Sequence, residues 1–391
     1  MKKIVIILPS LQHGGVQRSL IEAMNVVDTL KYDITVYVYS NCNTLIKLLP
    51  QNIKVIVDTD KSHYRRKPKS LLMHIALLFA KIFGRKESAK RFSEKIHAFV
   101  HREKSKYPAR QYFSDGVDVV ISYAMGLCTE MAVEIKADKR FLFFHSSDPN
   151  FHRDLSDKYF GKFDNIVAVG ENVQMMLKEN FPTVSKKIAL VKNYIDPENI
   201  KKLSEEYIVD TSIYEKKIII TSVIRVDKEK GADLIVSAAQ KLKKQKVSFL
   251  WYIVGDGITR IEIEKQISDN NLDKNIILVG FKDNPYPYVK CCDIFVHPAY
   301  EESFGLSILE ALILGKAVIS TETMGAKEVL NDGEFGLLVS IDSDSIADAI
   351  LNIINNPDLK RKYQLAYKDN DKIEKNIYKE KWETILNGGT L

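Results

Sequence analysis

The chain has 391 residues, of which 45% are hydrophobic and 28% are charged, and its net charge is +6. This length suits two domains better than one core, and the composition is that of a folded globular protein rather than a disordered one. The four cysteines have no metal-ligand spacing, which predicts reduced thiols in a cytoplasmic protein. No stretch approaches the ~20 apolar residues that span a bilayer.

The first half of the chain alternates apolar runs with helix patterns, which is typical of a doubly wound α/β domain. Residues 4–8 form an apolar run that predicts a buried strand, because the run is too short for a signal peptide. A loop with Gly14 and Gly15 follows, and then a helix pattern over 16–30. Further strands are predicted over residues 34–39, 53–57, 118–122, 140–145, 165–169 and 187–191.

Residues 61–110 differ from the rest of the chain, because 15 Lys and Arg against 3 Glu give them a charge of +12. One interpretation is a pair of helices that pack on the sheet and turn their Lys and Arg to solvent. A second is an interfacial patch that binds an anionic membrane surface on the inner face of the cell membrane. Nucleic acid is not an expected partner, since no recognition motif or aromatic cluster accompanies the charge.

A second α/β series begins after Asp196 and Pro197, where we predict the hinge between two domains. Helix patterns between its strands favour a parallel sheet with right-handed crossovers. The predicted strands cover residues 217–223, 248–254, 275–279, 293–297 and 317–320. Near the C-terminus one helical stripe is apolar and consists of Ile373, Ile377, Tyr378, Trp382, Ile385 and Leu386.

Two loops that lead into helices contain residues suited to an anion. Gly14 and Gly15 let an anion approach a helix N-terminus, although a plain tight turn is the alternative. The dinucleotide fingerprint G-x-G-x-x-G is absent, which disfavours NAD. Arg225 and Lys230 combine a guanidinium fork with a point charge, which suits a diphosphate leaving group. The alternative for this pair is a solvated charge run.

Two carboxylates, Glu302 and Glu310, lie in the loop and at the beginning of the helix that follow the strand at 293–297. Carboxyl ends of parallel strands form the ligand crevice of such sheets, so this is a place to hold a sugar or a phosphate. The alternatives are that Glu302 is an ordinary exposed acid, and that Ser307 and Glu310 form a capping box.

Two further residues follow strands at the same edges. His145 ends the strand at 140–145 and is either a hydrogen-bonded structural histidine or a residue of the cleft. Phe281 follows the strand at 275–279, in a loop against which a nucleotide base is expected.

Together these motifs resemble glycosyltransferase family 4, a retaining family with the GT-B fold. Glu302 and Glu310 match its E-x7-E motif, and Arg225 with Lys230 matches its R-x4-KG diphosphate segment. Two further matches are the glycine loop Gly14-Gly15-Val16 and the block Gly325-Ala326-Lys327-Glu328. Ile224, Ser303 and Ala326 stand where the family often has glycine.

The resemblance implies two Rossmann-like domains that face each other across a cleft. A first, acceptor-binding domain would cover residues 1–195, completed by a C-terminal helix over 372–391 that crosses back to it. A second domain over 196–371 would bind the nucleotide sugar. The implied reaction is retaining transfer of a sugar to a hydroxyl of a glycan or lipid-linked acceptor, in cell-envelope, capsule or other polysaccharide biosynthesis.

The resemblance also implies roles for single residues. Arg225 and Lys230 would bind the diphosphate of a UDP- or GDP-sugar, and Glu310 the ribose hydroxyls. Glu302 would contact the donor sugar, with His145 nearby. Backbone N–H groups of Phe304, Gly305 and Leu306 would assist Glu302, and no metal or other cofactor is generally needed in this family.

Two other functions are compatible with the same architecture. A nucleotide-sugar 2-epimerase or a sugar phosphorylase is one alternative to transfer. A non-catalytic protein that binds sugar nucleotides or anions is another. The second is disfavoured because both glutamates and both cations are present.

Overall fold

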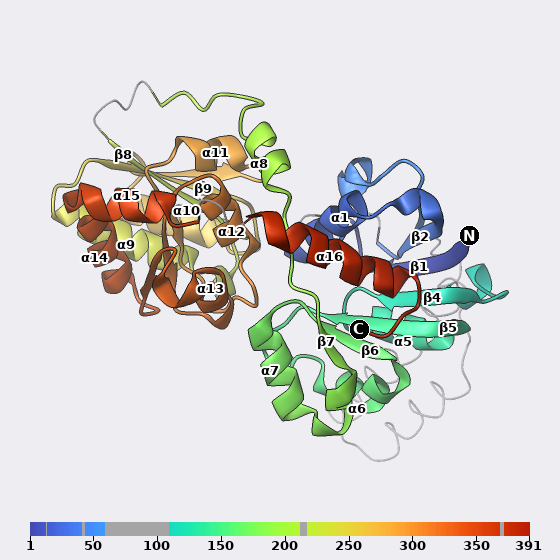
Figure 1. Cartoon of the computed structure of the whole chain (residues 1–391). Helices are drawn as coiled ribbons and strands as arrows, with labels where there is room; N and C mark the ends of the chain where they lie inside the picture. The colour runs from blue at the N-terminus through green and yellow to red at the C-terminus, as the bar shows by residue number, and fades with distance from the viewer. Residues whose placement is uncertain (13, 41–43, 59–108, 212–216, 368–370) are drawn as a thin grey trace, which may run out of the picture.

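The computed structural model describes the whole chain except residues 13, 41–43, 59–108, 212–216 and 368–370. It contains two parallel β-sheets, each covered by helices on both faces, so the predicted pair of Rossmann-like domains is confirmed (Figure 1). The basic segment 61–110, with both of its interpretations, lies almost entirely outside the described residues. No helix in the described part of the chain is long and apolar enough to cross a membrane.

The first sheet has seven strands in the order β3-β2-β1-β4-β5-β6-β7, and every strand predicted for this half is present. Its central strands are continuous apolar runs because helices cover both faces of the sheet. The strands are β1 (Lys2–Leu8), β2 (Tyr32–Val38), β3 (Lys54–Val57), β4 (Val117–Ser122), β5 (Ala137–Phe144), β6 (Asn165–Ala168) and β7 (Ile188–Leu190). The α-helices described here are α1 (Gly15–Val26), α5 (Leu127–Glu134), α6 (Arg153–Tyr159) and α7 (Glu171–Asn180).

The second sheet has six strands in the order β10-β9-β8-β11-β12-β13, the order of a dinucleotide-binding domain. The strands are β8 (Ile218–Val223), β9 (Phe249–Val254), β10 (Ile276–Gly280), β11 (Ile294–His297), β12 (Ala317–Thr321) and β13 (Leu337–Val339), the last of which was not predicted. The helices are α8 (Pro197–Leu203), α9 (Ala232–Lys244), α10 (Arg260–Asp269), α11 (Tyr286–Cys291), α12 (Leu306–Ile313), α13 (Met324–Val329), α14 (Ser343–Asn355) and α15 (Pro357–Leu365), and the short 3-10 turn η6 (Lys228–Lys230) precedes α9.

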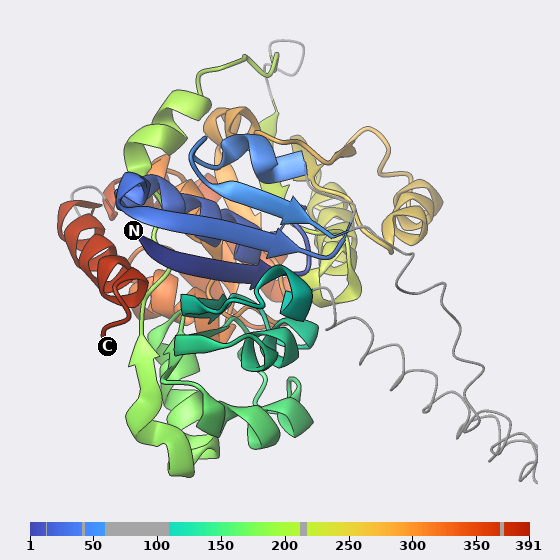
Figure 2. The ribbon, with the colours of Figure 1, turned by 90° about the vertical axis from the view of Figure 1, so that its right-hand side faces the viewer.

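The chain passes between the domains twice. Tyr194 packs in the core of the first sheet, whereas the next residue, Ile195, packs in a core of the second. The C-terminal helix α16 (Asp371–Leu386) then returns and lies beside α1 (Figure 1). In Figure 2 the first domain lies in front of the second, and α16 runs along its side.

The predicted apolar stripe of α16 is largely confirmed. Tyr378, Trp382, Ile385 and Leu386 are buried in the core of the first sheet. The prediction is wrong at Ile377, which is 48% exposed, because the helix turns that residue away from the sheet. Ile373 lies where side chains are not described.

Candidate active site between the two domains

Lys230 and Glu302, which are 72 residues apart in sequence, form an ion pair in the second domain. Lys230 ends η6, and its Nζ lies 2.9 Å from Oε2 of Glu302 in the loop between β11 and α12. Gly231 makes this approach possible: its φ is +69°, and a Cβ there would lie 2.0 Å from the carbonyl oxygen of Pro298. Only glycine fits, so the two loops pack against each other and hold the pair together.

Glu302 is further held by His297, the last residue of β11, which is only 2% exposed. Its Nε2 lies 3.2 Å from Oε2 of Glu302, and its Nδ1 lies 3.2 Å from Oγ of Ser307. Burial raises the pKa of Glu302, but the hydrogen bond from His297 and the charge of Lys230 outweigh it and hold that pKa below its usual range. Glu302 is therefore a fixed anion, and its interpretation as an ordinary exposed acid is wrong.

The backbone around Glu302 belongs to the same compact arrangement. The Ser303 N–H donates to Oε1 of Glu302, at 3.1 Å, and the Gly325 N–H at the start of α13 donates to the Glu302 carbonyl oxygen, at 2.9 Å. Gly305 adopts φ +94° and leads directly into α12 at Leu306. The Phe304 side chain is buried in the core, so only its backbone is available for binding.

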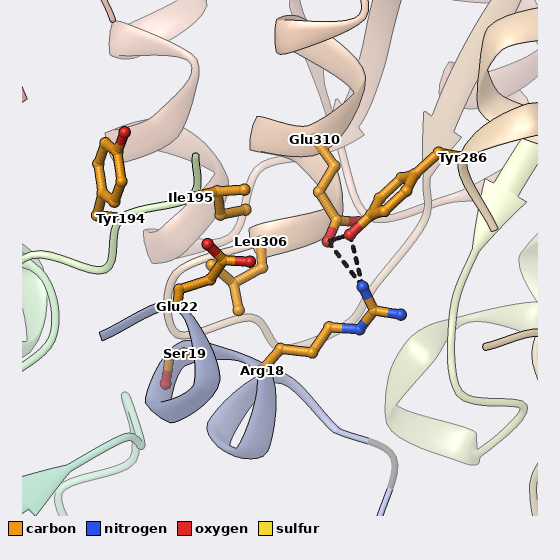
Figure 3. A pocket seen from close by; sticks show the side chains of 8 residues that line it. All are labelled: Arg18, Ser19, Glu22, Tyr194, Ile195, Tyr286, Leu306 and Glu310. Atoms are coloured by element: carbon orange, nitrogen blue, oxygen red, sulfur yellow. Dashed lines mark hydrogen bonds and ion pairs between the residues drawn. The ribbon is translucent and has the colours of Figure 1, made fainter. Parts of the chain in front are cut away.

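Glu310 lies on α12 and faces the first domain (Figure 3). The Tyr286 hydroxyl donates to its Oε1, at 3.0 Å, and Nη1 of Arg18 from α1 lies 3.9 Å from the same oxygen. Burial raises the pKa of Glu310, although Arg18 and Tyr286 act to lower it. The capping-box interpretation is wrong, because Gly305 precedes α12 without a side-chain cap and Ser307 contacts His297 instead.

Arg225 does not join these groups directly. It follows β8 with a side chain that is 59% exposed, and its guanidinium forms ion pairs with Asp227 and, at 3.6 Å, with Glu229. Both partners belong to its own loop, so the guanidinium is held by that loop. Phe281 follows β10 and is partly exposed.

His145 follows β5 in the first domain and packs against Tyr123. Burial lowers the pKa of His145 to about 4, against a backbone hydrogen bond with Tyr123 that acts to raise it, so the ring is neutral at pH 7. Its Nε2 is buried without a hydrogen-bond partner among the described residues. Two residues later, the Ser147 N–H donates to Oγ of Ser303, at 3.0 Å, which places the loop after His145 against the residue next to Glu302.

The glycine loop of the first domain faces the start of α12. Gly15 is the first residue of α1, and a Cβ placed there would lie 3.5 Å from Leu306 of the second domain. The glycine loop and the loop after His145 thus meet the loop and helix start after β11 from the opposite domain. In the described part of the chain, no group of three His, Cys, Asp or Glu side chains is placed to hold a metal ion.

The sequence interpretation assigned no role to three residues of this site: Arg18, Tyr286 and His297. His297 has a usable signal, because it ends a strand at the crevice edge and carries a titratable ring. For Arg18 the one signal in the sequence is its position one turn after the glycine loop. Tyr286 has no signal in the sequence, since its partner Glu310 is 24 residues away.

Comparison with known proteins finds a family match in the second half of the chain. Residues 204–373 match the family described as glycosyl transferases group 1. Over 190 residues the chain is 33% identical to the Campylobacter jejuni N-acetylgalactosamine-N,N'-diacetylbacillosaminyl-diphospho-undecaprenol 4-alpha-N-acetylgalactosaminyltransferase. The aligned stretch covers 48% of this chain and 50% of the relative. It is 26% identical over 201 residues to the Staphylococcus aureus poly(ribitol-phosphate) alpha-N-acetylglucosaminyltransferase, covering 50% of this chain and 41% of the relative. The chain thus spans about half the length of these two relatives or less.

Solved structures match over nearly the whole chain. A mutant of Staphylococcus aureus TarM in complex with fondaparinux, alpha-GlcNAc-glycerol and UDP aligns with a TM-score of 0.73 at 14% identity, over 99% of this chain and all of that one. Anabaena HepE in complex with UDP-glucose aligns with a TM-score of 0.71 at 17% identity, with the same coverage. At these identities the likeness shows the fold.

The fold and the family match together indicate the class of this protein. The chain has the GT-B fold, as predicted, and residues 204–373 are similar to the glycosyl transferases group 1 family.

Proposed function

We propose that the protein is a retaining glycosyltransferase that moves a sugar from a nucleotide-diphosphate sugar to a hydroxyl of a glycan or lipid-linked acceptor. The observation that carries this proposal is the half-buried Lys230–Glu302 ion pair beside the start of α12, opposite the glycine loop of the first domain. The family match of the second domain supports it. The protein would act in cell-envelope, capsule or other polysaccharide biosynthesis.

In this proposal the second domain binds the donor. Lys230 and Arg225 neutralise the diphosphate, which requires Arg225 to exchange its loop carboxylates for phosphate oxygens. Glu302, with the backbone N–H groups at 304–306, binds the donor sugar, and Glu310 accepts from the ribose hydroxyls. The base lies against the loop of Phe281. The neutral His145, with its unpartnered Nε2, hydrogen-bonds the transferred sugar from the first domain.

The reaction is a front-face substitution through an oxocarbenium-like transition state. The C1–O bond to the diphosphate breaks while the acceptor oxygen bonds to C1 on the same face, and the acceptor proton passes to the departing phosphate. Negative charge develops on the diphosphate, so preorganised cations supply the main stabilisation, on the order of several kcal/mol. Glu302 is ionised and acts as a hydrogen-bond acceptor rather than as a general acid.

The names of the relatives support envelope-type acceptors, since one carries a diphospho-undecaprenol acceptor in its name and another poly(ribitol-phosphate). HepE was solved with UDP-glucose, which favours a UDP-linked donor over a GDP-linked one.

We propose a cytoplasmic protein whose basic segment 61–110 binds an anionic membrane surface. Co-sedimentation tests this last point: equal binding to neutral and anionic vesicles would refute it.

The donor is identified by a thermal-shift screen with UDP-, GDP- and ADP-sugars, because a bound nucleotide raises the free energy of unfolding by RT ln(1 + [L]/Kd) and with it the melting temperature. The sugar that binds is then incubated with lipid-linked and glycan acceptors, and free nucleoside diphosphate is measured. Acceptor-dependent release together with a glycosylated product supports transfer. Release without an acceptor, or epimerised sugar, would favour the nucleotide-sugar 2-epimerase, and transfer to inorganic phosphate the phosphorylase.

A further inference from the structure

The Glu310 carboxylate, the proposed ribose ligand, is held by groups from both domains (Figure 3). A small pocket between the domains is lined by Arg18, Glu22, Tyr194, Tyr286, Leu306 and Glu310, together with Ser19 and Ile195. Arg18 supplies the positive charge among these lining residues, and it projects from α1 of the first domain. The site that would receive the nucleotide is therefore completed by a side chain from the opposite domain.

Hydrogen bonds to two uncharged groups of the second domain fix the guanidinium of Arg18. Nη1 donates to the Tyr286 hydroxyl, at 2.5 Å, and Nη2 donates to the Asp283 carbonyl oxygen, at 2.8 Å. The Glu310 carboxylate lies 3.9 Å from Nη1, and the charges of Glu22 and Asp283 act on the guanidinium more weakly than that of Glu310. The guanidinium carbon also lies 5.5 Å from the centre of the Tyr286 ring, which orders the pair further.

This arrangement leaves one carboxylate oxygen for a ligand. Tyr286 donates to Oε1 of Glu310, while no described residue donates to Oε2. A buried carboxylate accepts well from hydroxyls only when it stays ionised, and an adjacent cation favours that state. Opening the cleft would withdraw Arg18 and leave Glu310 with Tyr286 alone.

We propose that Arg18 is a positioning residue, which acts through Glu310 so that the ribose-binding carboxylate is fully set up only when the domains are closed. This inference rests on the proposed function and deepens it, since it assigns ribose recognition to a first-domain cation. Because coupling between two equilibria is reciprocal, nucleotide binding would in turn favour the closed cleft.

The test measures the affinity for UDP and for 2′-deoxy-UDP by titration calorimetry, in wild type and in Arg18→Met, Arg18→Lys and Lys47→Met. Lys47 is the matched control, because it also reaches across the cleft, 3.2 Å from Asp283, without contacting Glu310. Arg18→Met should weaken UDP binding about tenfold and lose most of the discrimination against 2′-deoxy-UDP. Arg18→Lys should recover part of that discrimination, and Lys47→Met should keep it.

A double-mutant cycle with Glu310→Gln separates a role through Glu310 from general damage. In the Glu310→Gln background, Arg18→Met should change the UDP to 2′-deoxy-UDP ratio by less than twofold. Equal weakening of both nucleotides by Arg18→Met, or an unchanged ratio, would overturn the inference and leave the proposed function standing. Failure of wild type to bind UDP, GDP or ADP would instead overturn the proposed function, and this inference with it.

Discussion

The two faces of the cleft are built in different ways. On the second-domain face, Lys230, Glu302 and His297 form one contact cluster around the Glu302 carboxylate, and all three belong to one domain. Their geometry is therefore independent of how the two domains are placed. On the first-domain face, Arg18 and Ser147 instead reach their partners across the cleft, so those contacts exist only when the cleft is closed.

Another contact between the domains is of the same kind as those of Arg18 and Ser147. Glu328 of α13 accepts hydrogen bonds from the N–H groups of Glu171 and Asn172, at 2.7 and 3.1 Å, and so caps helix α7 of the first domain. The Asn172 side chain returns a hydrogen bond to the Met324 carbonyl oxygen, at 2.7 Å. The comparison indicates that Lys230, Glu302 and His297 are preorganised within one domain, whereas the contacts from the first domain form only when the cleft is closed.

The largest effect should follow from removing the preorganised cation. Lys230→Ala should lower kcat about 10²-fold or more, because the diphosphate charge and Glu302 both lose their partner. Steady-state kinetics with the identified donor and acceptor measure this, with Lys228→Ala as control, since Lys228 lies in the same turn and is exposed. Wild-type turnover in Lys230→Ala would remove the diphosphate assignment.

His297 should have the next largest effect. His297→Leu removes the hydrogen bond to Glu302, so the pKa of that carboxyl should rise and kcat should fall about tenfold. In wild type the depressed pKa of Glu302 keeps it ionised at neutral and mildly acidic pH. The acid limb of the pH–rate profile should therefore move to higher pH in His297→Leu. A profile of unchanged shape would show that His297 only fills space.

The same comparison explains what the sequence could predict. Apolar strands and the loops after them are local patterns, so both sheets except β13, and the positions of Lys230 and Glu302 in loops after strands, could be predicted. The Glu310 partners were not, because Arg18 belongs to the other domain and Tyr286 to a different helix, 24 residues away in sequence. Contacts between separate elements depend on how those elements pack, and no periodicity encodes that. The capping-box interpretation of Glu310 failed because α12 begins two residues earlier than the motif requires, after Gly305.

Loss of the cross-domain cap should have a smaller effect. Glu328→Ala leaves two N–H groups at the start of α7 without their acceptor, which should cost about 1 kcal/mol, the usual scale of an N-terminal cap. The melting temperature should fall by about 2–4 °C. Lys327→Ala is the control, because that neighbour is half-exposed and pairs with Glu322 at the surface. An equal shift in both variants would argue against a specific cap.

The last effect is on the pH dependence of stability and arises at Glu22 on α1, a residue of the pocket between the domains. Burial raises the pKa of Glu22 to about 7, against a hydrogen bond from the Asp196 N–H that acts to lower it; the charges of Asp196 and Glu310 raise it further and that of Arg18 lowers it. A glutamate in the unfolded chain titrates at about 4.3, so between about pH 4.5 and 7 the folded protein holds a proton that the unfolded chain has lost. Folding stability therefore decreases as pH rises through that window.

Glu22→Gln stays neutral and should escape this loss. The melting temperature of the variant should match wild type at pH 5 and exceed it by several degrees at pH 8, because each unit by which the pKa is raised corresponds to about 1.4 kcal/mol. Glu198→Gln, at an exposed position near the same hinge, should show no such divergence. Because Glu22 accepts from the Asp196 N–H at the hinge and lies one helical turn from Arg18, parallel melting curves at both pH values would mean that the closed cleft does not bury it.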